Sequence, residues 1–493
     1  MEKKYVLAID QSTQGTKALL FDRAGKAAAR EDIPHKQIIN ENGWVSHDLN
    51  EIYSNTIEAV KRLLAQTKTE PEEIDCIGIS NQRETSAVWD RKTGEPLAEA
   101  VVWQCARAQS ISDRIRRQGC SEMIRSRTGL NLSPYFPASK YAWLLENIPQ
   151  LKAKQEQGSL CFGTIDTWLL FRLTGGQCYK TDYSNASRTQ LYNIRSLCWD
   201  TDICALFGIE PGLLPEVCES GSMLGTTGLE GTFPEPVPIC AMIGDSQAAL
   251  FGQGCIRQGM IKSTYGTGSS VMMNTGSYPD NHETGLVTSI AWGINGTVDY
   301  VLEGNINYTG AVVTWLKDDM GLIQSPGETE SLARDASPVD NCYLVPAFTG
   351  LGAPYWNSQA RAVISGMSRT TGKKEIVRAA LESIAYQITD IVTLMKDQTG
   401  IDIQELCVDG GPTKNHYLMK FQSDILNIPV TLPKCEESSA QGAAYLAGLT
   451  SGFYDDNELF KRSERTQFLP EMEERDRSEK YKGWKQAVAR VLI

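Results

Sequence analysis

Three short segments rich in glycine and hydroxyl side chains stand where they could bind phosphate. They are DQSTQGT from Asp10 to Thr16, TYGTGSS from Thr264 to Ser270, and DGGPTKN from Asp409 to Asn415. Glycine permits backbone dihedrals that let successive N–H groups converge on an anion, and serine or threonine hydroxyls add donors. Each segment alone is typical of an ordinary hairpin turn. Together, in two halves of one chain, they indicate that a single nucleotide binds between such turns.

The familiar nucleotide-binding sequences do not account for this pattern. The Walker sequence G-x-x-x-x-G-K-[ST] is absent, and GTGSSV from Gly266 to Val271 lacks the last glycine of G-x-G-x-x-G. A phosphate site in this chain must therefore be built from other turns.

Polar residues that follow two apolar segments could carry the remaining chemistry. Asp245 follows the strand predicted over residues 240–243. It could accept a proton from an attacking hydroxyl, or it could cap the helix that begins beside it. Arg83 and Glu84 follow the strand predicted over residues 74–79, and a guanidinium beside a carboxylate suits adjacent hydroxyl groups, which both donate and accept. The alternative for this pair is a surface ion pair of little energetic value.

Alternating strands and helices position these residues. Apolar runs and turn residues predict the pattern strand, polar turn, strand near the N-terminus, and the same pattern recurs after residue 259. This repetition predicts an α/β chain of two similar lobes with a cleft between them. The other predicted elements are strands over residues 74–79 and 405–408, helices over 50–65 and 441–449, and a solvated terminal helix over 471–485.

Composition excludes several classes of protein. The chain has 493 residues, which is too long for one core, and a net charge of -12, which disfavours nucleic acid or an anionic membrane as a partner. Its N-terminus lacks the apolar region of a secretion signal, and no segment reaches the ~18 continuous apolar residues of a membrane helix. The 13 cysteines are scattered singly, which disfavours a zinc site or a disulfide framework. We therefore expect a cytoplasmic protein.

Two longer segments resemble the signatures of a known family. YFPASKYAWLLEN (Tyr135–Asn147) resembles the first signature of the FGGY carbohydrate kinases, and AVISGMSRTTGKKEIVRAALE (Ala362–Glu382) resembles the second. Within that family the chain is most similar to the glycerol kinases, over nearly its full length. The segments that carry this likeness are GWVSHD, NQRET, VVWQC, GTIDTWLLFRLTGG, the run Asn-Ala-Ser-Arg-Thr, PAFTGLGAPYW and FQSDIL.

The resemblance implies a fold and an activity. It implies a two-lobed α/β protein with the actin-like or ribonuclease H-like ATPase fold and a deep interdomain cleft. Residues 1–250 would bind a small polyol or sugar, and residues 251–493 would bind ATP. The implied reaction is ATP-dependent phosphorylation of a hydroxyl of that acceptor, with Mg²⁺, and the implied assembly is a dimer.

The resemblance also implies a role for individual residues. Asp245 and Asp10 would be catalytic, with Asp245 as the base and a magnesium contact and Asp10 orienting the magnesium through water. Residues in contact with the acceptor would be Arg83, Glu84, Trp103, Tyr135, Asp245, Ser246 and Ser270. Residues in contact with the nucleotide would be Thr13, Gln14, Lys17, Gly266, Thr267, Gly310, Gly411 and Asn415.

Several positions depart from the glycerol kinase pattern. Ser12 replaces a glycine in the first phosphate turn, so its backbone must adopt a conformation that a side chain tolerates. Ser246 and Ser270 replace a glutamine and a phenylalanine, which predicts a roomier pocket for a longer polyol or a ketose. The segment GLEGTFPEPVPI (Gly228–Ile239) lacks the glycine-rich, arginine-containing loop through which some glycerol kinases bind a sugar bisphosphate, so we do not expect that regulation.

Two alternative functions fit parts of the sequence. A ketopentose kinase for xylulose or ribulose would share the fold, the nucleotide turns and the aspartate base. An actin-like or chaperone-like ATPase would use the same nucleotide site without a small acceptor. The segment NQRET together with Trp103 and Tyr135 favours a kinase over such an ATPase.

Overall fold

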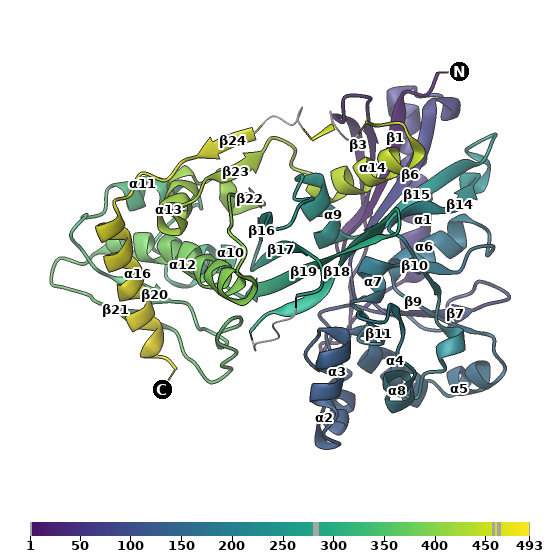
Figure 1. The fold of residues 1–493 in the computed structure, drawn as a ribbon, viewed down its shortest axis with the longest axis horizontal. Helices are drawn as coiled ribbons and strands as arrows, with labels where there is room; N and C mark the ends of the chain where they lie inside the picture. Colours follow the sequence, from purple (N-terminus) through teal and green to yellow (C-terminus); the bar gives the residue numbers. More distant parts are fainter. Residues whose placement is uncertain (1, 280–284, 456–458, 461–464, 493) are drawn as a thin grey trace. The chain divides into compact units, whose positions relative to one another are not determined.

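The computed structural model describes residues 2–279, 285–455, 459–460 and 465–492 of a chain that forms two compact units (Figure 1). Unit 1 comprises Met1–Gly254, Thr288–Tyr300 and Glu437–Arg462, and unit 2 comprises Cys255–Val287, Val301–Glu436 and Ser463–Ile493. The single boundary after residue 250 that the sequence predicts separates most of each unit. Two later segments of the chain nevertheless belong to unit 1.

Unit 1 is built on a mixed sheet with the strand order β18-β14-β15-β6-β1-β2-β3. Its centre is parallel, because β6 pairs in parallel with both β1 and β15. Strands β2 and β3 are antiparallel to their neighbours, and β14 is antiparallel to β15 but parallel to β18. The strands are β1 (Tyr5–Gln11), β2 (Gly15–Phe21), β3 (Ala27–Pro34), β6 (Ile74–Asn81), β14 (Gly221–Thr227), β15 (Val237–Gly244) and β18 (Val287–Ile294).

Unit 2 contains a second mixed sheet segment with the order β24-β23-β22-β16-β17-β19. Strand β16 is antiparallel to β17 and parallel to β22, and β22 is parallel to β23. The strands are β16 (Ile261–Tyr265), β17 (Ser269–Gly276), β19 (Thr297–Ile306, which belongs to unit 2 from Val301 on), β22 (Leu406–Asp409), β23 (Val430–Pro433) and β24 (Arg465–Phe468).

The repeated hairpin predicted from the sequence is confirmed. In unit 1 the hairpin β1–β2 has its first strand paired in parallel with β6, and in unit 2 the hairpin β16–β17 has its first strand paired in parallel with β22. One detail of the prediction is wrong, since Asp10 lies within β1 and pairs with Lys17 of β2. The first polar turn is therefore shorter than the segment from Asp10 to Thr16.

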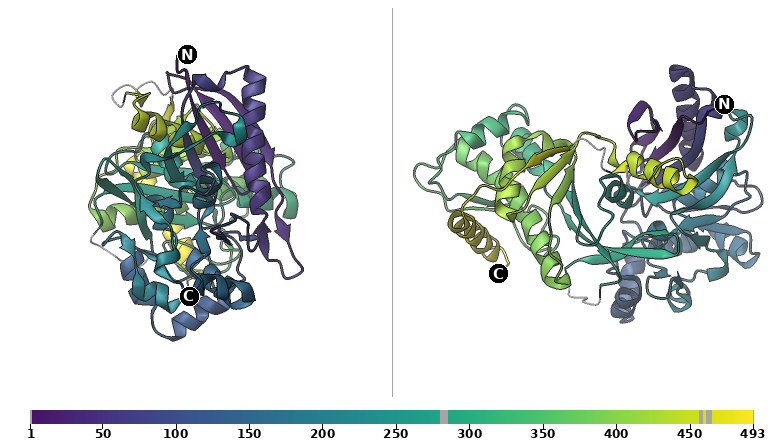
Figure 2. Two further views of the ribbon diagram at one scale, coloured as in Figure 1. Left: turned by 90° about the vertical axis from the view of Figure 1, so that its right-hand side faces the viewer. Right: turned by 45° about the horizontal axis from the view of Figure 1, so that its top comes forward.

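Small residues allow a helix from late in the chain to pack closely within unit 1. Helix α14 (Ser438–Ser451) lies against β1, β6 and β15 and against helix α9 (Asp245–Gly252) (Figures 1 and 2). A Cβ atom added at Gly442 would lie 1.8 Å from the carbonyl oxygen of Ala248. Such an approach is available only to glycine. The small-residue helix predicted at this segment is therefore confirmed, and its composition explains its contact with α9.

Each unit has its own hydrophobic core, and unit 2 also uses the end of the chain for its core. Helix α12 (Lys373–Thr399) packs on β17 and on β20 (Tyr343–Val345), and helix α16 (Glu474–Ala489) also contacts β20. The prediction that the terminal helix is solvated is wrong for one face, because Trp484 is fully buried and its indole N–H donates to Asp390 at 2.8 Å. Other helices are α1 (Leu49–Thr67), α4 (Pro137–Asn147), α6 (Ile165–Leu173), α7 (Tyr183–Ala186), α10 (Gly310–Thr314), α11 (Glu328–Arg334) and α13 (His416–Leu426).

Two further expectations can be compared with the described residues. All 13 cysteines are free thiols, and most of them are buried. No helix in the described ranges combines the length and the apolar composition that crossing a membrane requires.

Candidate active site

The carboxyl ends of the three parallel strands of unit 1 bring the predicted catalytic residues to one edge of the sheet. Asp10 of β1 is in register with Ser80 of β6, and Ser80 is in register with Ile243 of β15. Arg83 therefore follows the end of β6, and Asp245 follows the end of β15. This edge is where open α/β sheets place their ligands.

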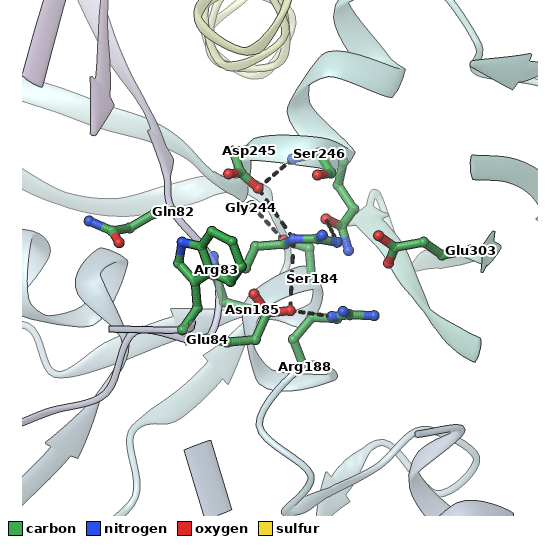
Figure 3. Close-up of polar contacts among 12 residues, drawn as sticks. Gln82, Arg83, Glu84, Ser184, Asn185, Arg188, Gly244, Asp245, Ser246 and Glu303 are labelled. Carbon is green, nitrogen blue, oxygen red and sulfur yellow. Dashed lines mark hydrogen bonds and ion pairs between the residues drawn. The ribbon is translucent and has the colours of Figure 1, made fainter. Parts of the chain in front are cut away.

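Asp245 is held by two donors and keeps a partly exposed carboxylate (Figure 3). Its Oδ1 lies 3.2 Å from the Nε of Arg83 and accepts a hydrogen bond of 2.7 Å from the backbone N–H of Ser246. The Asp245 side chain is 40% exposed, whereas that of Arg83 is 6% exposed. Asp245 is the first residue of α9, and Gly244 occupies the cap position. Asp245 is thus an oriented carboxylate with access to a ligand, and the capping alternative is wrong.

Arg83 and Glu84 form an ion pair, but it is long and buried and is not the surface pair that the sequence left open. The Nε of Arg83 is 3.9 Å from Glu84, while the Nε of Arg188 donates to Oε1 of Glu84 at 2.6 Å. The side chains of Glu84 and Arg188 are each 1% exposed, and the two are drawn together in Figure 3. The backbone of Glu84 has φ 63°, a conformation that costs a non-glycine residue free energy and is concentrated at functional sites. The alternative of a weak surface pair is therefore wrong.

Arg83 instead spans two residues of α9. Its Nη1 donates to Oε1 of Gln247 at 3.2 Å in addition to its contact with Asp245. Gln247 is fully buried, and its amide also donates to the carbonyl of Ile290 at 3.3 Å. The direction of the guanidinium is therefore fixed from both sides.

A buried network of hydrogen bonds stabilises this edge of the sheet. Asp182 accepts hydrogen bonds from the backbone N–H groups of Ser184 and Asn185, and the amide of Asn185 exchanges hydrogen bonds with Asn81 at the end of β6. The hydroxyl of Ser184 accepts from the N–H of Gly244 at 2.8 Å. The strand ends that carry Arg83 and Asp245 are therefore tied to α7.

Two half-buried aromatic rings stand beside this edge. The rings of Trp103 and Tyr135 lie 5.6 Å apart between centroids at an interplanar angle of 60°. The indole N–H of Trp103 donates to the hydroxyl of Thr13 at 2.9 Å. Trp103, predicted to contact the acceptor, therefore touches a residue predicted to contact the nucleotide. Neither ring is fully buried, as a core aromatic would be.

The first phosphate turn is closed by the residue that departs from the family pattern. The hydroxyl of Ser12 accepts from the N–H groups of Gln14 and Gly15, both at 3.3 Å, and donates to the carbonyl of Gly15 at 3.0 Å. The φ angle of Ser12 is not positive, so its backbone tolerates a side chain, as predicted. Two N–H groups that could face a phosphate are thus engaged by a side chain. Gln14 is exposed, and its carbonyl accepts from the N–H of His35.

Lys17 is already paired within unit 1. Its ammonium lies 2.6 Å from Oε2 of Glu437, which also forms an ion pair with Arg30. Sequence analysis gave no role to Glu437, which directly precedes α14. To reach a phosphate as predicted, Lys17 must exchange this carboxylate for the anion.

The surroundings of Asp10 fit a hydrated cation. The pKa of Asp10 is raised to about 6, chiefly by burial, which Lys17 and Ser80 oppose and the nearby carboxylates of Asp245 and Glu437 reinforce. Lys17, Arg30 and Arg83 offset the charge of these three carboxylates, so Mg²⁺ would bind here together with phosphate groups, which bring further negative charge. Across the residues that the structure describes, no group of three or more His, Cys, Asp or Glu side chains forms a metal site. Water and substrate phosphates would therefore have to complete the coordination, as is usual for Mg²⁺.

The second and third turns are packed against one another within unit 2. The N–H of Gly310 donates to the carbonyl of Gly266 at 2.8 Å, and the N–H of Ala311 donates to the carbonyl of Thr267 at 3.0 Å. Gly410 has φ 98°, and a Cβ atom there would lie 2.0 Å from the carbonyl oxygen of Tyr265. Helix α10 and the turn after β22 therefore both meet the turn of the β16–β17 hairpin.

One cavity of about 490 Å³ in unit 2 collects three residues predicted to contact the nucleotide. Gly310, Gly411 and Asn415 all line it, and Asn415 donates to the hydroxyl of Thr329 at 3.0 Å while capping α13. Leu381, within the second signature segment, forms part of its wall. The remaining lining residues are Val313, Thr314, Pro326, Gly327, Thr329, Glu330, Ile384, Pro412, Lys414 and Leu418. Apolar side walls with a few polar groups suit a flat aromatic base.

The two serines that depart from the family pattern have different surroundings. Ser246 is part of α9 and supplies the N–H that orients Asp245. Ser270 lies on β17 in unit 2, and its hydroxyl donates to Oε1 of Glu303 at 2.9 Å. Glu303 is 1% exposed. A polar pair therefore stands where the family pattern has an aromatic side chain.

Sequence reasoning gave no role to Arg188, Gln247 or Glu303. Arg188 falls in the run Asn-Ala-Ser-Arg-Thr, which carried the resemblance without a function, and Gln247 follows Asp245 by two residues. Glu303 lies in an otherwise apolar strand segment, where a charged residue is a sign of a buried polar role.

Comparisons with known proteins agree with this architecture. The model of the FGGY family of carbohydrate kinases, N-terminal domain, matches residues 5–252, and that of the C-terminal domain matches residues 261–451. The chain is 48% identical to glycerol kinase of Carboxydothermus hydrogenoformans over 493 residues, covering 100% of this chain and 99% of the relative. It is 47% identical to glycerol kinase of Enterococcus casseliflavus, covering 99% and 97% respectively.

Solved structures have the same fold. The crystal structure of Plasmodium falciparum glycerol kinase with ADP matches with a TM-score of 0.94 and 37% identity, covering 100% of this chain and 99% of the other. Xylulose kinase from Lactobacillus acidophilus matches with a TM-score of 0.88 at 22% identity, over 99% and 97% of the two chains, which shows the fold alone. The predicted two-domain α/β, actin-like sugar kinase fold is confirmed. This chain therefore belongs to the FGGY family of carbohydrate kinases, because family models match both of its halves and a relative is 48% identical over the full length of this chain.

Proposed function

We propose that this enzyme transfers the terminal phosphoryl group of ATP to a hydroxyl of a small polyol, in the manner of a glycerol kinase. The observation that carries the proposal is the partly exposed Asp245 carboxylate, held by Arg83 and the Ser246 N–H at the edge where β1, β6 and β15 end. An oriented carboxylate at a ligand-binding edge is what proton transfer from an alcohol requires.

The acceptor site would be formed by Arg83, Glu84, Trp103 and Tyr135. The guanidinium of Arg83 donates and the carboxylate of Glu84 accepts, so that neighbouring hydroxyls of a polyol can be bound in one orientation. The Trp103 and Tyr135 rings supply apolar surface for the carbon chain. Arg188 donates a hydrogen bond to Glu84 and so fixes the direction of that carboxylate.

The chemical step is a displacement at phosphorus. The acceptor hydroxyl gives its proton to Asp245 while its oxygen forms a bond to the terminal phosphorus of ATP, and the bond from that phosphorus to the bridging oxygen breaks, which releases ADP. Mg²⁺, bound through water by Asp10 and contacted by Asp245, would offset charge on the phosphate oxygens. Thr13, Gln14 and Lys17 would contact phosphates from unit 1. Thr267, Gly310, Gly411 and Asn415 would bind the nucleotide in unit 2, with Gly266 shaping the turn.

The variant Asp245→Asn tests the assignment of the base. The amide has nearly the same shape but cannot accept the proton, so we expect kcat to fall by at least about a hundredfold while the acceptor KM changes little. The matched control is Asp113→Asn, which alters an exposed carboxylate on another helix. If Asp245→Asn phosphorylates the acceptor at the rate of the control, another residue is the base.

Ser246 and Ser270 favour an acceptor longer than glycerol. Each is a small side chain where the family pattern has a larger one, which removes bulk from the pocket that the resemblance implies. The assay compares kcat/KM for glycerol, erythritol, xylitol, xylulose and ribulose. A four- or five-carbon polyol should lead, and a decisive preference for glycerol would contradict the enlarged pocket. A preference for ketoses would instead favour the ketopentose kinase alternative.

The variant Ser270→Phe tests the enlarged pocket by filling it. Restoring an aromatic side chain should lower the ratio of kcat/KM for the longer polyol to that for glycerol by about tenfold. Ser270→Thr, which keeps the hydroxyl and adds one methyl group, is the control. An unchanged ratio in Ser270→Phe would remove Ser270 from the acceptor site.

Acceptor-dependent turnover separates a kinase from an ATPase. ADP release should be stimulated by the acceptor, whereas a chaperone-like ATPase would hydrolyse ATP equally with and without it. A cytoplasmic location and a dimeric assembly stay predictions from the family resemblance.

A further inference from the structure

One lysine of the first signature segment is completely buried with its ammonium among backbone carbonyl groups. Lys140 lies on α4 and is 0% exposed. Its Nζ donates to the carbonyl oxygens of Tyr135 at 2.5 Å, Glu84 at 3.2 Å and Trp103 at 3.3 Å. An ammonium has three N–H donors and no acceptor, so three carbonyl groups use its full capacity.

The three carbonyl groups belong to three of the residues that the proposed function assigns to the acceptor. They come from separate parts of the chain, because Lys140 is 56 residues from Glu84, 37 from Trp103 and 5 from Tyr135. The contact with Glu84 also falls on the residue whose backbone has φ 63°. A single cation thus connects three loops whose side chains would contact one small molecule.

We propose that Lys140 is a positioning residue that fixes Glu84, Trp103 and Tyr135 relative to one another through their backbones and so sets the affinity for the acceptor. This inference rests on the proposed function, since it takes these three residues as the acceptor site. Lys140 itself touches no reacting atom. Its effect is to hold three binding groups in one arrangement before the acceptor arrives. Less conformational entropy is then lost when the acceptor binds.

The charge state of Lys140 matters to this role. The pKa of Lys140 is lowered to about 7, chiefly by burial, which Glu84 and Cys105 oppose and Arg107 reinforces. The Glu84 carboxylate is itself paired with Arg188, and the Nε of Arg107 donates to the Sγ of Cys105 at 3.1 Å. A neutral amine has two N–H groups for three carbonyl groups. The arrangement should therefore be firm when the amine is protonated and weaker as the pH rises past this pKa.

The variant Lys140→Met tests the inference, because methionine keeps a similar volume without the donors. We expect the acceptor KM to rise by about ten- to a hundredfold while the KM for ATP stays within about twofold of the wild type. The matched control is Leu144→Ala, a buried change on the same helix that touches none of the three carbonyl groups. It should lower thermal stability and leave the acceptor KM unchanged.

A measurement on the wild type keeps the inference testable if Lys140→Met does not fold. Between about pH 6 and pH 8 the acceptor KM should rise several-fold, while the KM for ATP changes less. Two results would overturn the role of Lys140 alone. One is a wild type that phosphorylates a polyol with an acceptor KM independent of pH, and the other is a folded Lys140→Met with an unchanged acceptor KM. A wild type that phosphorylates no polyol would instead overturn the proposed function.

Discussion

Glu84 and Arg188, 104 residues apart in the chain, form a charge-assisted hydrogen bond of 2.6 Å in which both side chains are 1% exposed. Arg83 and Glu84 are neighbours in the chain, but their side chains have different close partners. Arg83 contacts Asp245 and Gln247, whereas Glu84 contacts Arg188. A buried ion pair of this kind contributes little net stability, but either partner alone is costly. Its value here is that it fixes a carboxylate at the proposed acceptor site.

The variant Arg188→Met should therefore be strongly destabilised. It leaves Glu84 buried without its closest cation, and we expect the free energy of unfolding to fall by about 3 kcal/mol. Urea unfolding measures the change. The control is Arg114→Met, which breaks an ion pair with Glu146 whose side chains are 41% and 40% exposed and should cost less than about 1 kcal/mol. Equal losses in the two variants would mean that the Glu84–Arg188 contact does not carry this cost.

This pair also marks what the sequence could not predict. The strands ending at Gln11, Asn81 and Gly244 follow from local apolar runs, and the turns after them from local glycine and hydroxyl residues. The contact between Glu84 and Arg188 depends on two segments that meet only in the folded unit. Local patterns carry no information on such long-range pairing, so the sequence predicts a role for Arg83 and Glu84 but does not predict the partner of Glu84.

The placement of α14 has the same cause. Its small residues predict close packing, and Gly442 packs as expected against Ala248. Which sheet the helix meets is decided by the fold of the whole chain, and a single boundary after residue 250 would have assigned it to the other lobe. Glu437, which pairs with Lys17, directly precedes this helix. The sequence does not predict that ion pair for the same reason.

The first phosphate turn gives a prediction on nucleotide binding. The variant Ser12→Ala removes the hydroxyl that accepts from the N–H groups of Gln14 and Gly15, which frees both donors for a phosphate. We expect the KM for ATP to fall by a few-fold, because backbone N–H groups bind phosphate well when no side chain competes for them. Steady-state kinetics at saturating acceptor measures it.

The variant Ser12→Thr is the control, since it retains the hydroxyl and adds one methyl group. It should keep the wild-type KM for ATP if the hydrogen bonds of the hydroxyl are what matters. A higher KM in Ser12→Ala would show instead that the Ser12 hydroxyl assists the nucleotide.

A buried carboxyl group away from the proposed site gives a prediction on pH and stability. The pKa of Asp166 is raised to about 6, chiefly by burial and also by Asp182, whereas hydrogen bonds from Thr164 and Thr181 oppose the rise. The folded state therefore holds this proton more tightly than the unfolded state, in which the pKa is near 3.9. Stability from this group rises as the pH falls from about 6 to about 4, and is lost as the pH rises through the folded pKa.

The variant Asp166→Asn removes that dependence. The difference in unfolding free energy between wild type and variant should shift in favour of the wild type by about 2 to 3 kcal/mol as the pH falls from about 7 to about 4. Chemical denaturation at several pH values measures it, with Asp202→Asn, whose side chain is 68% exposed, as the control for loss of one acidic group. A constant difference across this range would show that the carboxyl group does not titrate as stated.

The cavity in unit 2 can be tested without disturbing the fold. Gly411 lines it, has no positive φ, and a Cβ atom added there would meet nothing within 4 Å. The variant Gly411→Val should therefore fold normally while its side chain occupies space that a nucleotide needs. We expect the KM for ATP to rise by about tenfold or more, with the acceptor KM and the thermal stability near their wild-type values.

Gly212→Val is the matched control, because Gly212 of unit 1 also lacks a positive φ, and its nearest contact for an added Cβ atom, a side-chain oxygen of Glu210, is 4.0 Å away. It introduces the same side chain outside the cavity and should leave both KM values unchanged. Direct binding of ATP, measured by calorimetry without acceptor, separates loss of affinity from slower chemistry. If Gly411→Val binds ATP as tightly as Gly212→Val does, the nucleotide does not occupy this cavity, and Gly310 and Asn415 lose the observation that links them to ATP.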